Sequence, residues 1–271
     1  MAAASASLRR FAAIVALASA TALLTACEIR EAGTDRPASA RAFPEPDRPV
    51  SQIGSNRFST ERARDERSEA AIVMEMADIR PGMTVADIGA GEGYYTVRLA
   101  ERVGSSGRVL AQDIDSDTVD QLGQRVERER LDNVSIKLGR PDDPGLPAES
   151  FDRIFLVHMY HEVAEPYAFL WRLHPALKAG GQIIVVDADR QSDAHGIAPK
   201  LLFCEFQAVG FRLAAFNRRP DIAGYYARFE SAGNRPEPDE IKACRQDIAG
   251  SRMRNNMAEA TMPSAGKDVP S

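Results

Sequence analysis

Two short stretches carry most of the residues that could do chemistry. The first, ADIGAGEGYY over residues 86–95, places an aspartate before three glycines at alternate positions. Glycine has no Cβ, so it lets a ligand approach the backbone closely. The second, HMYHEV over residues 158–163, gathers two histidines, a tyrosine and a glutamate. Imidazole and carboxylate groups are common proton acceptors in catalysis. The two stretches therefore predict a ligand-binding loop and a separate acid–base cluster.

The elements that must position these stretches alternate along the chain. Apolar strands are expected to be separated by amphipathic helices, a pattern typical of a parallel sheet covered on both faces. Two final strands are expected to complete the sheet as an antiparallel pair. The predicted fold class is α/β, with a single doubly wound, mostly parallel sheet. Strands are expected over residues 83–89, 108–114, 134–139, 152–159, 181–188, 211–217 and 224–230, and helices over 59–79, 93–103, 116–130, 166–178 and 198–210.

The glycine loop follows a predicted strand and opens a predicted helix. The first turn of a helix has unpaired N–H groups that can face a ligand. A dinucleotide fingerprint would need its third glycine at the position of Tyr94, so the spacing here is D-x-G-x-G-x-G instead. Asp113 closes the second strand, about 20 residues farther on, where a carboxylate can accept hydrogen bonds from ribose hydroxyls. A nucleoside ligand is therefore expected.

The D-x-G-x-G-x-G spacing resembles motif I of class I S-adenosylmethionine-dependent methyltransferases. The segments GRVLAQDID, GRPDDPGLPAESFDRIFLVHMYHEV and LKAGGQIIVVD follow in the order of that family's later motifs. The resemblance covers about residues 59–231 and is strongest to an uncharacterised bacterial subgroup with a D-D-P-x-L-P segment and a Tyr-His pair, here Tyr160 and His161. It implies a Rossmann-like fold, S-adenosylmethionine as cofactor, and a small-molecule or lipid-like acceptor.

The same resemblance implies a set of cofactor-binding residues. Asp87 would help to fix the amino group of the cofactor, the glycines would surround its methionine portion, and Asp113 would hold the ribose. Many relatives place an aspartate directly after the glycine of the third strand, but this chain has Arg140 there, so Asp142 is the expected substitute near adenine. Tyr94 could line the pocket or simply pack at the helix start. The expected set is Asp87, Gly89, Ala90, Gly91, Gly93, Tyr94, Asp113, Ile114, Asp142 and His158.

Catalytic residues are expected among Tyr160, His161 and Glu162. Methyl transfer from a sulfonium needs alignment above all, and proton removal only for some acceptors. His161 is the expected base, because an unperturbed imidazole can take up a proton at neutral pH. The alternative is that His161 and Glu162 cap the next helix or fix a loop. His195 is expected at the surface, and no metal site is expected, because no C-x-x-C spacing is present.

The N-terminus resembles a bacterial lipoprotein signal. Arg9 and Arg10 precede an apolar run over residues 11–26, which is too short for a membrane span but suits a signal peptide. The run ends in LTAC, which resembles a lipobox with Cys27 as the lipidated residue. We therefore expect a signal peptide over residues 1–26, a lipid anchor in the membrane, and a place in the bacterial cell envelope facing the periplasm. The alternatives are an uncleaved anchor with a chance cysteine, or a cytoplasmic protein whose start is misassigned.

Composition divides the rest of the chain. Residues 27–56 are expected to form a flexible tether, residues 57–232 the methyltransferase-like domain, and residues 233–271 an extension that is largely disordered after about 250. The net charge of −5 argues against nucleic acid as a partner. Two functions remain open: an S-adenosylmethionine-dependent methyltransferase, or an exported lipoprotein that keeps the fold as a non-catalytic binding module.

Two side-chain questions also stay open in the sequence. Cys204 and Cys244 could pair in an oxidising compartment, but the apolar surroundings of Cys204 favour a buried free thiol. The charged residues of the first helix, among them Arg62 and Arg64, could form a lid over the cofactor or a solvated face. We expect the free thiol and the solvated face.

Overall fold

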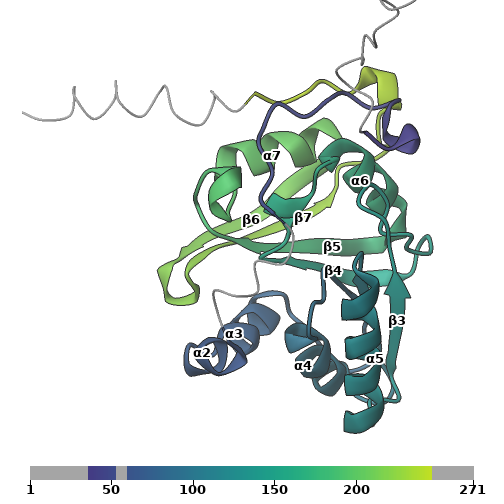
Figure 1. The fold of residues 1–271 in the computed structure, drawn as a ribbon, viewed down its shortest axis with the longest axis vertical. Helices are drawn as coiled ribbons and strands as arrows, with labels where there is room; N and C mark the ends of the chain where they lie inside the picture. Colours follow the sequence, from purple (N-terminus) through teal and green to yellow (C-terminus); the bar gives the residue numbers. More distant parts are fainter. Residues whose placement is uncertain (1–35, 53–59, 246–271) are drawn as a thin grey trace, which may run out of the picture. The chain divides into compact units, whose positions relative to one another are not determined.

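A seven-stranded sheet organises the molecule in the computed structural model, which describes residues 36–52 and 60–245 (Figure 1). The strand order is β3-β2-β1-β4-β5-β7-β6. The first five strands of this order are parallel, and β7 pairs antiparallel with both β5 and β6. The predicted α/β class and the terminal antiparallel pair are therefore confirmed. The strands are β1 Thr84–Ile88, β2 Arg108–Asp113, β3 Val134–Leu138, β4 Phe151–Val157, β5 Leu177–Asp187, β6 Phe211–Arg219 and β7 Gly224–Ser231.

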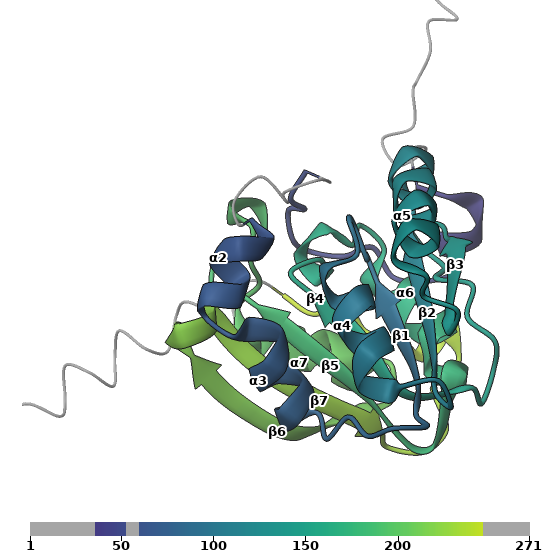
Figure 2. The same cartoon turned by 90° about the horizontal axis from the view of Figure 1, so that it is seen from below.

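Helices cover both faces of the sheet, because alternate strand residues point to opposite sides. On β1, Ala86 and Ile88 face a core that includes the helices α6 and α7, whereas Val85 faces a core that includes α3 and α4. Figures 1 and 2 show these two helical layers with the sheet between them. The helices are α2 Glu61–Glu66, α3 Glu69–Met76, α4 Tyr94–Val103, α5 Ser116–Glu129, α6 Pro166–Leu173 and α7 Pro199–Ala208.

Two predicted helices are shorter than the sequence suggested. The helix expected over residues 59–79 is divided into α2 and α3, because Ser68 has a φ of 54° and cannot continue the helix. Thr60 caps α2 by accepting a hydrogen bond from the Ala63 N–H group. Pro175 shortens the helix expected over residues 166–178, because proline cannot continue a helix. Helix α6 ends at Leu173, and a 3-10 turn leads into β5.

The prediction of a flexible tether is wrong for residues 37–52. Ala40 and Phe43 belong to the core on the α6 and α7 side of the sheet, and the Phe43 ring lies edge-on to Trp171 with 5.5 Å between centroids. Arg48 is buried in an ion pair with Glu205 of α7. These apolar contacts and this buried ion pair dock the segment onto the domain. We call residues 37–52 the N-terminal strap.

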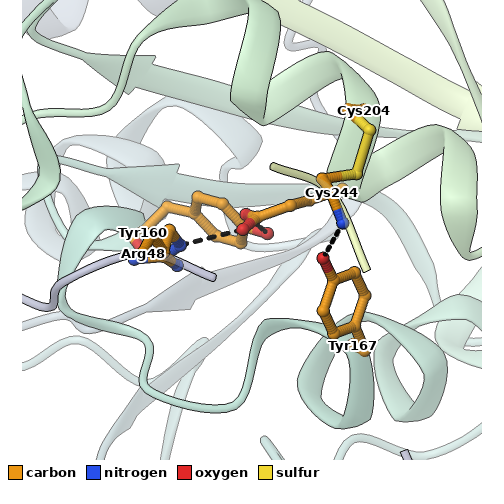
Figure 3. Close-up of a disulfide and its surroundings, with 6 residues drawn as sticks. Arg48, Tyr160, Tyr167, Cys204 and Cys244 are labelled. Atoms are coloured by element: carbon orange, nitrogen blue, oxygen red, sulfur yellow. Dashed lines mark hydrogen bonds and ion pairs between the residues drawn. A yellow bond between two sulfur atoms is a disulfide. The ribbon is translucent and has the colours of Figure 1, made fainter. Parts of the chain in front are cut away.

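The domain also continues beyond the predicted end at residue 232. Ile241 and Cys244 are buried, and the Trp171 indole N–H group donates to the Pro236 carbonyl oxygen at 2.9 Å. Cys244 forms a disulfide with Cys204 of α7, so the expectation of a free Cys204 thiol is wrong (Figure 3). The sequence missed this pairing because the apolar setting of Cys204 suits a free thiol and a disulfide equally well.

Several predicted features lie outside the described residues. These are the signal peptide, the lipidation site Cys27, the first part of the tether, and the tail after residue 245. Within residues 36–52 and 60–245, no helix has both the length and the apolar character that a membrane span requires.

Candidate functional site

The glycine loop joins β1 to α4 at the carboxyl edge of the sheet. Gly89, Gly91 and Gly93 all have positive φ angles, of 66°, 54° and 87°. A Cβ on Gly89 would lie 2.9 Å from the side chain of Met159, and one on Gly93 would lie 2.5 Å from Leu122. The loop therefore needs glycine both for its backbone conformation and for its close packing.

Asp113, at the end of β2, is fixed against this loop. Its Oδ2 accepts a hydrogen bond from the Gly91 N–H group at 2.9 Å, and its Oδ1 accepts from the Ile114 and Asp115 N–H groups at 2.8 Å and 3.1 Å. Asp113 Oδ2 therefore keeps a lone pair for a further donor, whereas Oδ1 already accepts two hydrogen bonds. Asp113 is therefore a preorganised acceptor beside the loop.

Two clefts meet at the loop. The larger cleft, of about 360 Å³, has Gly91, Asp113 and Ile114 on one wall and His158, Met159 and Glu162 on another. The smaller cleft, of about 270 Å³, is lined by Thr60, Glu61 and Arg64 from α2 and its cap, together with Asp87, Ala90 and Tyr94. Gly89, Val157 and His158 line both clefts. Together they provide a continuous site at the carboxyl ends of the parallel strands, where ligands bind in such sheets.

Asp87 lies at the smaller cleft and is almost completely buried. Its Oδ2 accepts a hydrogen bond from the Thr96 hydroxyl at 2.7 Å. Burial raises the pKa of Asp87 to about 6, although the bond from Thr96 and the charge of Arg64 act in the opposite direction. A cationic ligand group near Asp87 would favour its charged form.

Helix α2 covers the smaller cleft through Arg64. The Arg64 guanidinium lies 3.9 Å from the centre of the Tyr94 ring and 2.7 Å from the Glu69 carboxylate. Burial alone would raise the pKa of Glu69, but hydrogen bonds from His158 and Arg64 lower it to about 2. Arg62, in contrast, is 88% exposed. The charged residues of α2 therefore divide between the two interpretations: Arg64 covers the cleft, and Arg62 lies on the solvated face.

The three predicted catalytic residues lie at different depths. Glu162 lines the larger cleft. His161 is buried behind it, with Nδ1 at 2.9 Å from Asp187 Oδ1 and Nε2 at 3.9 Å from Glu162 Oε1. Tyr160 does not reach the cleft, because its buried hydroxyl donates to Glu205 at 2.8 Å on the other side of the chain. We therefore remove Tyr160 from the catalytic set. The N-cap residue of α6 is Glu165, and its own side chain makes no capping hydrogen bond.

Asp142 is also displaced from its expected place. Its carboxylate accepts hydrogen bonds from the Ser39 hydroxyl at 2.5 Å and from Arg172 at 2.6 Å, and it is absent from the lining of both clefts. Arg140 and Pro141 line the larger cleft instead. The N-terminal strap, which supplies Ser39, and helix α6, which supplies Arg172, together turn this carboxylate away from the cofactor side.

Sequence reasoning missed two residues near His161. Asp187, the last residue of β5, holds the His161 ring, and its place at the carboxyl end of a buried strand was the available signal. His195 was expected at the surface, but its ring lies edge-on to His161 with 5.8 Å between centroids. Nothing in the sequence connects His195 with residues 158–163, because the approach depends on the loop after β5.

Residues 79–207 match the family model described as "Methyltransferase domain". This match assigns residues 79–207, just under half of the chain, to a methyltransferase domain. The chain is 32% identical over 183 residues to the ubiquinone/menaquinone biosynthesis C-methyltransferase UbiE of Hydrogenovibrio crunogenus, an alignment that covers 62% of this chain and 66% of that protein. It is 37% identical over 86 residues to nocamycin O-methyltransferase of Saccharothrix syringae, covering 32% of this chain and 31% of that protein. The chain thus spans 31% and 66% of the lengths of these two curated relatives.

Solved structures show the same fold. A methyltransferase from Aquifex aeolicus, described as SAM dependent, superposes with a TM-score of 0.56 at 23% identity, covering 62% of this chain and 92% of that one. The [4+2]-cyclase SpnF superposes with a TM-score of 0.52 at 18% identity, covering 66% of this chain and 68% of that one. At these identities the likeness concerns the fold alone.

The methyltransferase domain and its fold imply S-adenosylmethionine as cofactor. The residues present fit this molecule in three respects. Asp113 is held by backbone N–H groups with acceptor capacity remaining, and the glycine loop leaves its backbone open at the larger cleft. Buried Asp87, at the adjoining smaller cleft, offers a carboxylate for the amino group.

Proposed function

We propose that the protein transfers a methyl group from S-adenosylmethionine to a small-molecule or lipid-like acceptor in the larger cleft. One observation carries the proposal: the larger cleft has the fixed Asp113 and glycine loop on one wall and Glu162 on the other. A cofactor held on the first wall would present its reactive group to an acceptor at the second. The relatives support methyl transfer, and the comparisons give the non-catalytic interpretation no support.

The residues would act mainly by positioning. The bound cofactor supplies an activated methyl group on a sulfonium. Asp113 would hold the ribose, Asp87 the amino group, and the glycine loop the methionine portion between them. Alignment of acceptor, methyl group and sulfur can account for about 7–11 kcal/mol of the barrier. The relatives include a C-methyltransferase and an O-methyltransferase, which supports carbon or oxygen as the acceptor atom.

Glu162 and His161 would serve an acceptor that must lose a proton. Glu162 faces the cleft, and His161 lies directly behind it with its Nδ1 held by Asp187. General-base assistance of this kind contributes typically about 10²–10⁴-fold in rate. Replacement of His161 by glutamine is expected to abolish turnover and to leave cofactor affinity intact.

The binding half of this proposal is tested by calorimetry with S-adenosylmethionine and S-adenosylhomocysteine. Wild-type protein is expected to bind both, and Asp113→Ala is expected to weaken both by about 100-fold, because a charge-assisted hydrogen bond to the ribose and the acceptor that fixes the Gly91 N–H group are lost together. Asp120→Ala, an exposed change on α5, is the matched control and should bind as wild type does. Absence of heat for both ligands with the wild type would overturn the proposal.

We further propose that the protein is exported and anchored in the cell envelope through Cys27. Two observations support this place: the signal-like N-terminus, and the disulfide between Cys204 and Cys244, which is a bond that persists in oxidising compartments. Metabolic labelling with a fatty acid should mark wild-type protein in the membrane fraction and leave Cys27→Ala unlabelled. An unlabelled, soluble wild type would contradict the lipid anchor.

A further inference from the structure

Three potential metal ligands converge beside the larger cleft. They are His161 and Glu162, in the 3-10 turn Tyr160–Glu162 after β4, and His195, directly after the 3-10 turn Ser192–Ala194. One ligand atom from each lies within 4.8 Å of the others. The proposed function gives His161 and Glu162 a role in proton removal but gives His195 none, so the convergence of all three requires a further explanation.

The His161 imidazole supplies a second, independent observation. Its ring is 2% exposed, and its Nε2 has no hydrogen-bond partner within the described ranges. Nδ1 lies 2.9 Å and 3.0 Å from the two oxygens of Asp187, so Nδ1 carries the hydrogen that this carboxylate accepts. The Nε2 lone pair then points among the other two side chains of the cluster.

This arrangement leaves a buried lone pair 3.9 Å from the nearest Glu162 oxygen. That distance is too long for a hydrogen bond, so a proton on Nε2 would remain poorly satisfied. An unsatisfied buried polar atom destabilises the folded state. A cation between Nε2 and the carboxylate would give this buried nitrogen a partner.

We propose that His161 Nε2, Glu162 and His195 form a binding site for a divalent first-row transition metal ion. Two imidazoles and one carboxylate suit Zn²⁺ and Fe²⁺, and they leave coordination positions open for other ligands. Metal–ligand bonds of about 2.0–2.2 Å require the three ligand atoms to approach by roughly 1 Å from their present separations. Side-chain rotation of Glu162 at the cleft can supply this movement.

The surroundings already orient the ligands. The contact from Asp187 to His161 Nδ1 is the carboxylate–histidine arrangement that commonly supports metal-bound imidazole. Ser51 of the N-terminal strap accepts a hydrogen bond from the His195 N–H group at 3.1 Å, and its own N–H group donates to the His161 carbonyl oxygen at 3.3 Å. Through Ser51 alone, the strap thus holds the backbone of both His161 and His195.

The site also specifies a class of acceptor, an inference that rests on the proposed function. Glu162 lines the larger cleft, so the open positions of the ion would face the bound acceptor. A metal ion at this place binds oxygen and makes a bound hydroxyl more acidic. The acceptor would therefore carry a hydroxyl or carbonyl oxygen next to the methylated atom.

Metal binding is tested directly on tag-free full-length protein after removal of metal with a chelator. Calorimetry with Zn²⁺ is expected to show one equivalent bound, and Co²⁺ is expected to give a visible absorption band of a low-coordinate site. His195→Ala should weaken Zn²⁺ binding by at least 100-fold, and Asp187→Asn by about 10–100-fold. His174→Ala, which lies outside the cluster, is the matched control and should bind as the wild type does.

The outcomes separate this site from the proposed methyl transfer. S-adenosylhomocysteine should bind His195→Ala with wild-type affinity, which also shows that the variant is folded. Saturable Zn²⁺ binding without any S-adenosylhomocysteine binding would remove the proposed function and keep the metal site. Normal S-adenosylhomocysteine binding without saturable Zn²⁺ binding, or equal Zn²⁺ affinity in wild type and His195→Ala, would overturn the metal site alone. An Nε2–H signal of His161 that persists with excess Zn²⁺ would overturn it as well.

Discussion

The two walls of the larger cleft are built by different means. The cofactor wall is formed by backbone groups that are close in sequence, such as the Gly91 N–H group that donates to Asp113, 22 positions away. The acceptor wall depends on side chains that are distant in sequence. Arg48 reaches Glu205 across 157 positions, and Ser51 contacts His195 across 144. One wall is a local motif, and the other is an assembly of long-range contacts.

This difference implies that a mutation can disturb one wall of the cleft without disturbing the other. The N-terminal strap contacts the chain on either side of His161, since Arg48 donates to the Val163 carbonyl oxygen at 2.9 Å and Ser51 donates to the carbonyl oxygen of His161 itself. No comparable contact from Arg48 or Ser51 reaches the glycine loop among the described residues. Damage to the strap should therefore lower stability and disturb the acceptor wall, while cofactor affinity is kept.

The largest effect is expected from Arg48→Met. Arg48 and Glu205 are 0% and 1% exposed, with 2.9 Å between Nε and Oε1 (Figure 3). Removing one partner of a buried pair leaves the other without its counter-charge and costs about 3–5 kcal/mol. The free energy of unfolding, measured by urea titration, should fall by this amount, while S-adenosylhomocysteine affinity under native conditions should stay within about twofold of the wild type.

Arg62→Met provides the matched control. Arg62 pairs with Glu66 at the same 2.9 Å, but the two side chains are 88% and 62% exposed, and such pairs contribute about 0–1 kcal/mol. Equal losses in the two variants would show that the strap is not held by its buried ion pair. A large loss of cofactor affinity in Arg48→Met would show that the two walls are coupled.

A smaller loss is expected from breaking the disulfide. Cys204 and Cys244 close a loop of 40 residues, and a crosslink of this kind stabilises by about 2–4 kcal/mol. The variant Cys204→Ala/Cys244→Ala should unfold at lower urea concentration by that free energy. Reductant should lower the stability of the wild type and leave the variant unchanged. A wild type that is insensitive to reductant would contradict a structural role for the bond.

The sequence was sufficient for the sheet and for the cofactor wall. Strand and helix positions follow from hydrophobic periodicity, and the glycine loop and Asp113 lie on consecutive elements whose order places them together. Helix ends were less well predicted. The break at Ser68 depends on a single left-handed residue, and serine gives little warning of that conformation.

The acceptor wall could not be assembled from the sequence. The strap has the composition of a tether, and only its docking reveals that Ala40, Phe43 and Arg48 are buried. Asp142 matched an expected position, but Ser39 and Arg172 take up its carboxylate. No motif in the sequence around His195 indicated that its ring lies near His161. In each case the residue's place depends on a contact between segments that are far apart in the sequence. Hydrophobic periodicity reveals helices and strands, but it does not reveal such contacts.

The smallest predicted effect sharpens the assignment of Asp87 to the cofactor wall. Burial raises its pKa to about 6, so the free native protein keeps a proton that the unfolded chain releases near pH 4. The contribution of Asp87 to stability therefore falls as the pH rises from about 4 to about 6. A bound cationic amino group reverses the preference, because it favours the ionised carboxylate.

Affinity for S-adenosylhomocysteine should consequently rise by about tenfold between pH 5 and pH 7.5, since the ionised fraction of a group with a pKa of 6 rises from about a tenth to nearly one. Calorimetry across this range measures the change. Asp87→Asn keeps the size and hydrogen-bonding capacity of the side chain but cannot ionise, so its weaker affinity should be flat over the same pH range. An equal pH dependence in Asp87→Asn would show that another group causes the change in affinity. The amino group of the cofactor would then need a different partner on this wall.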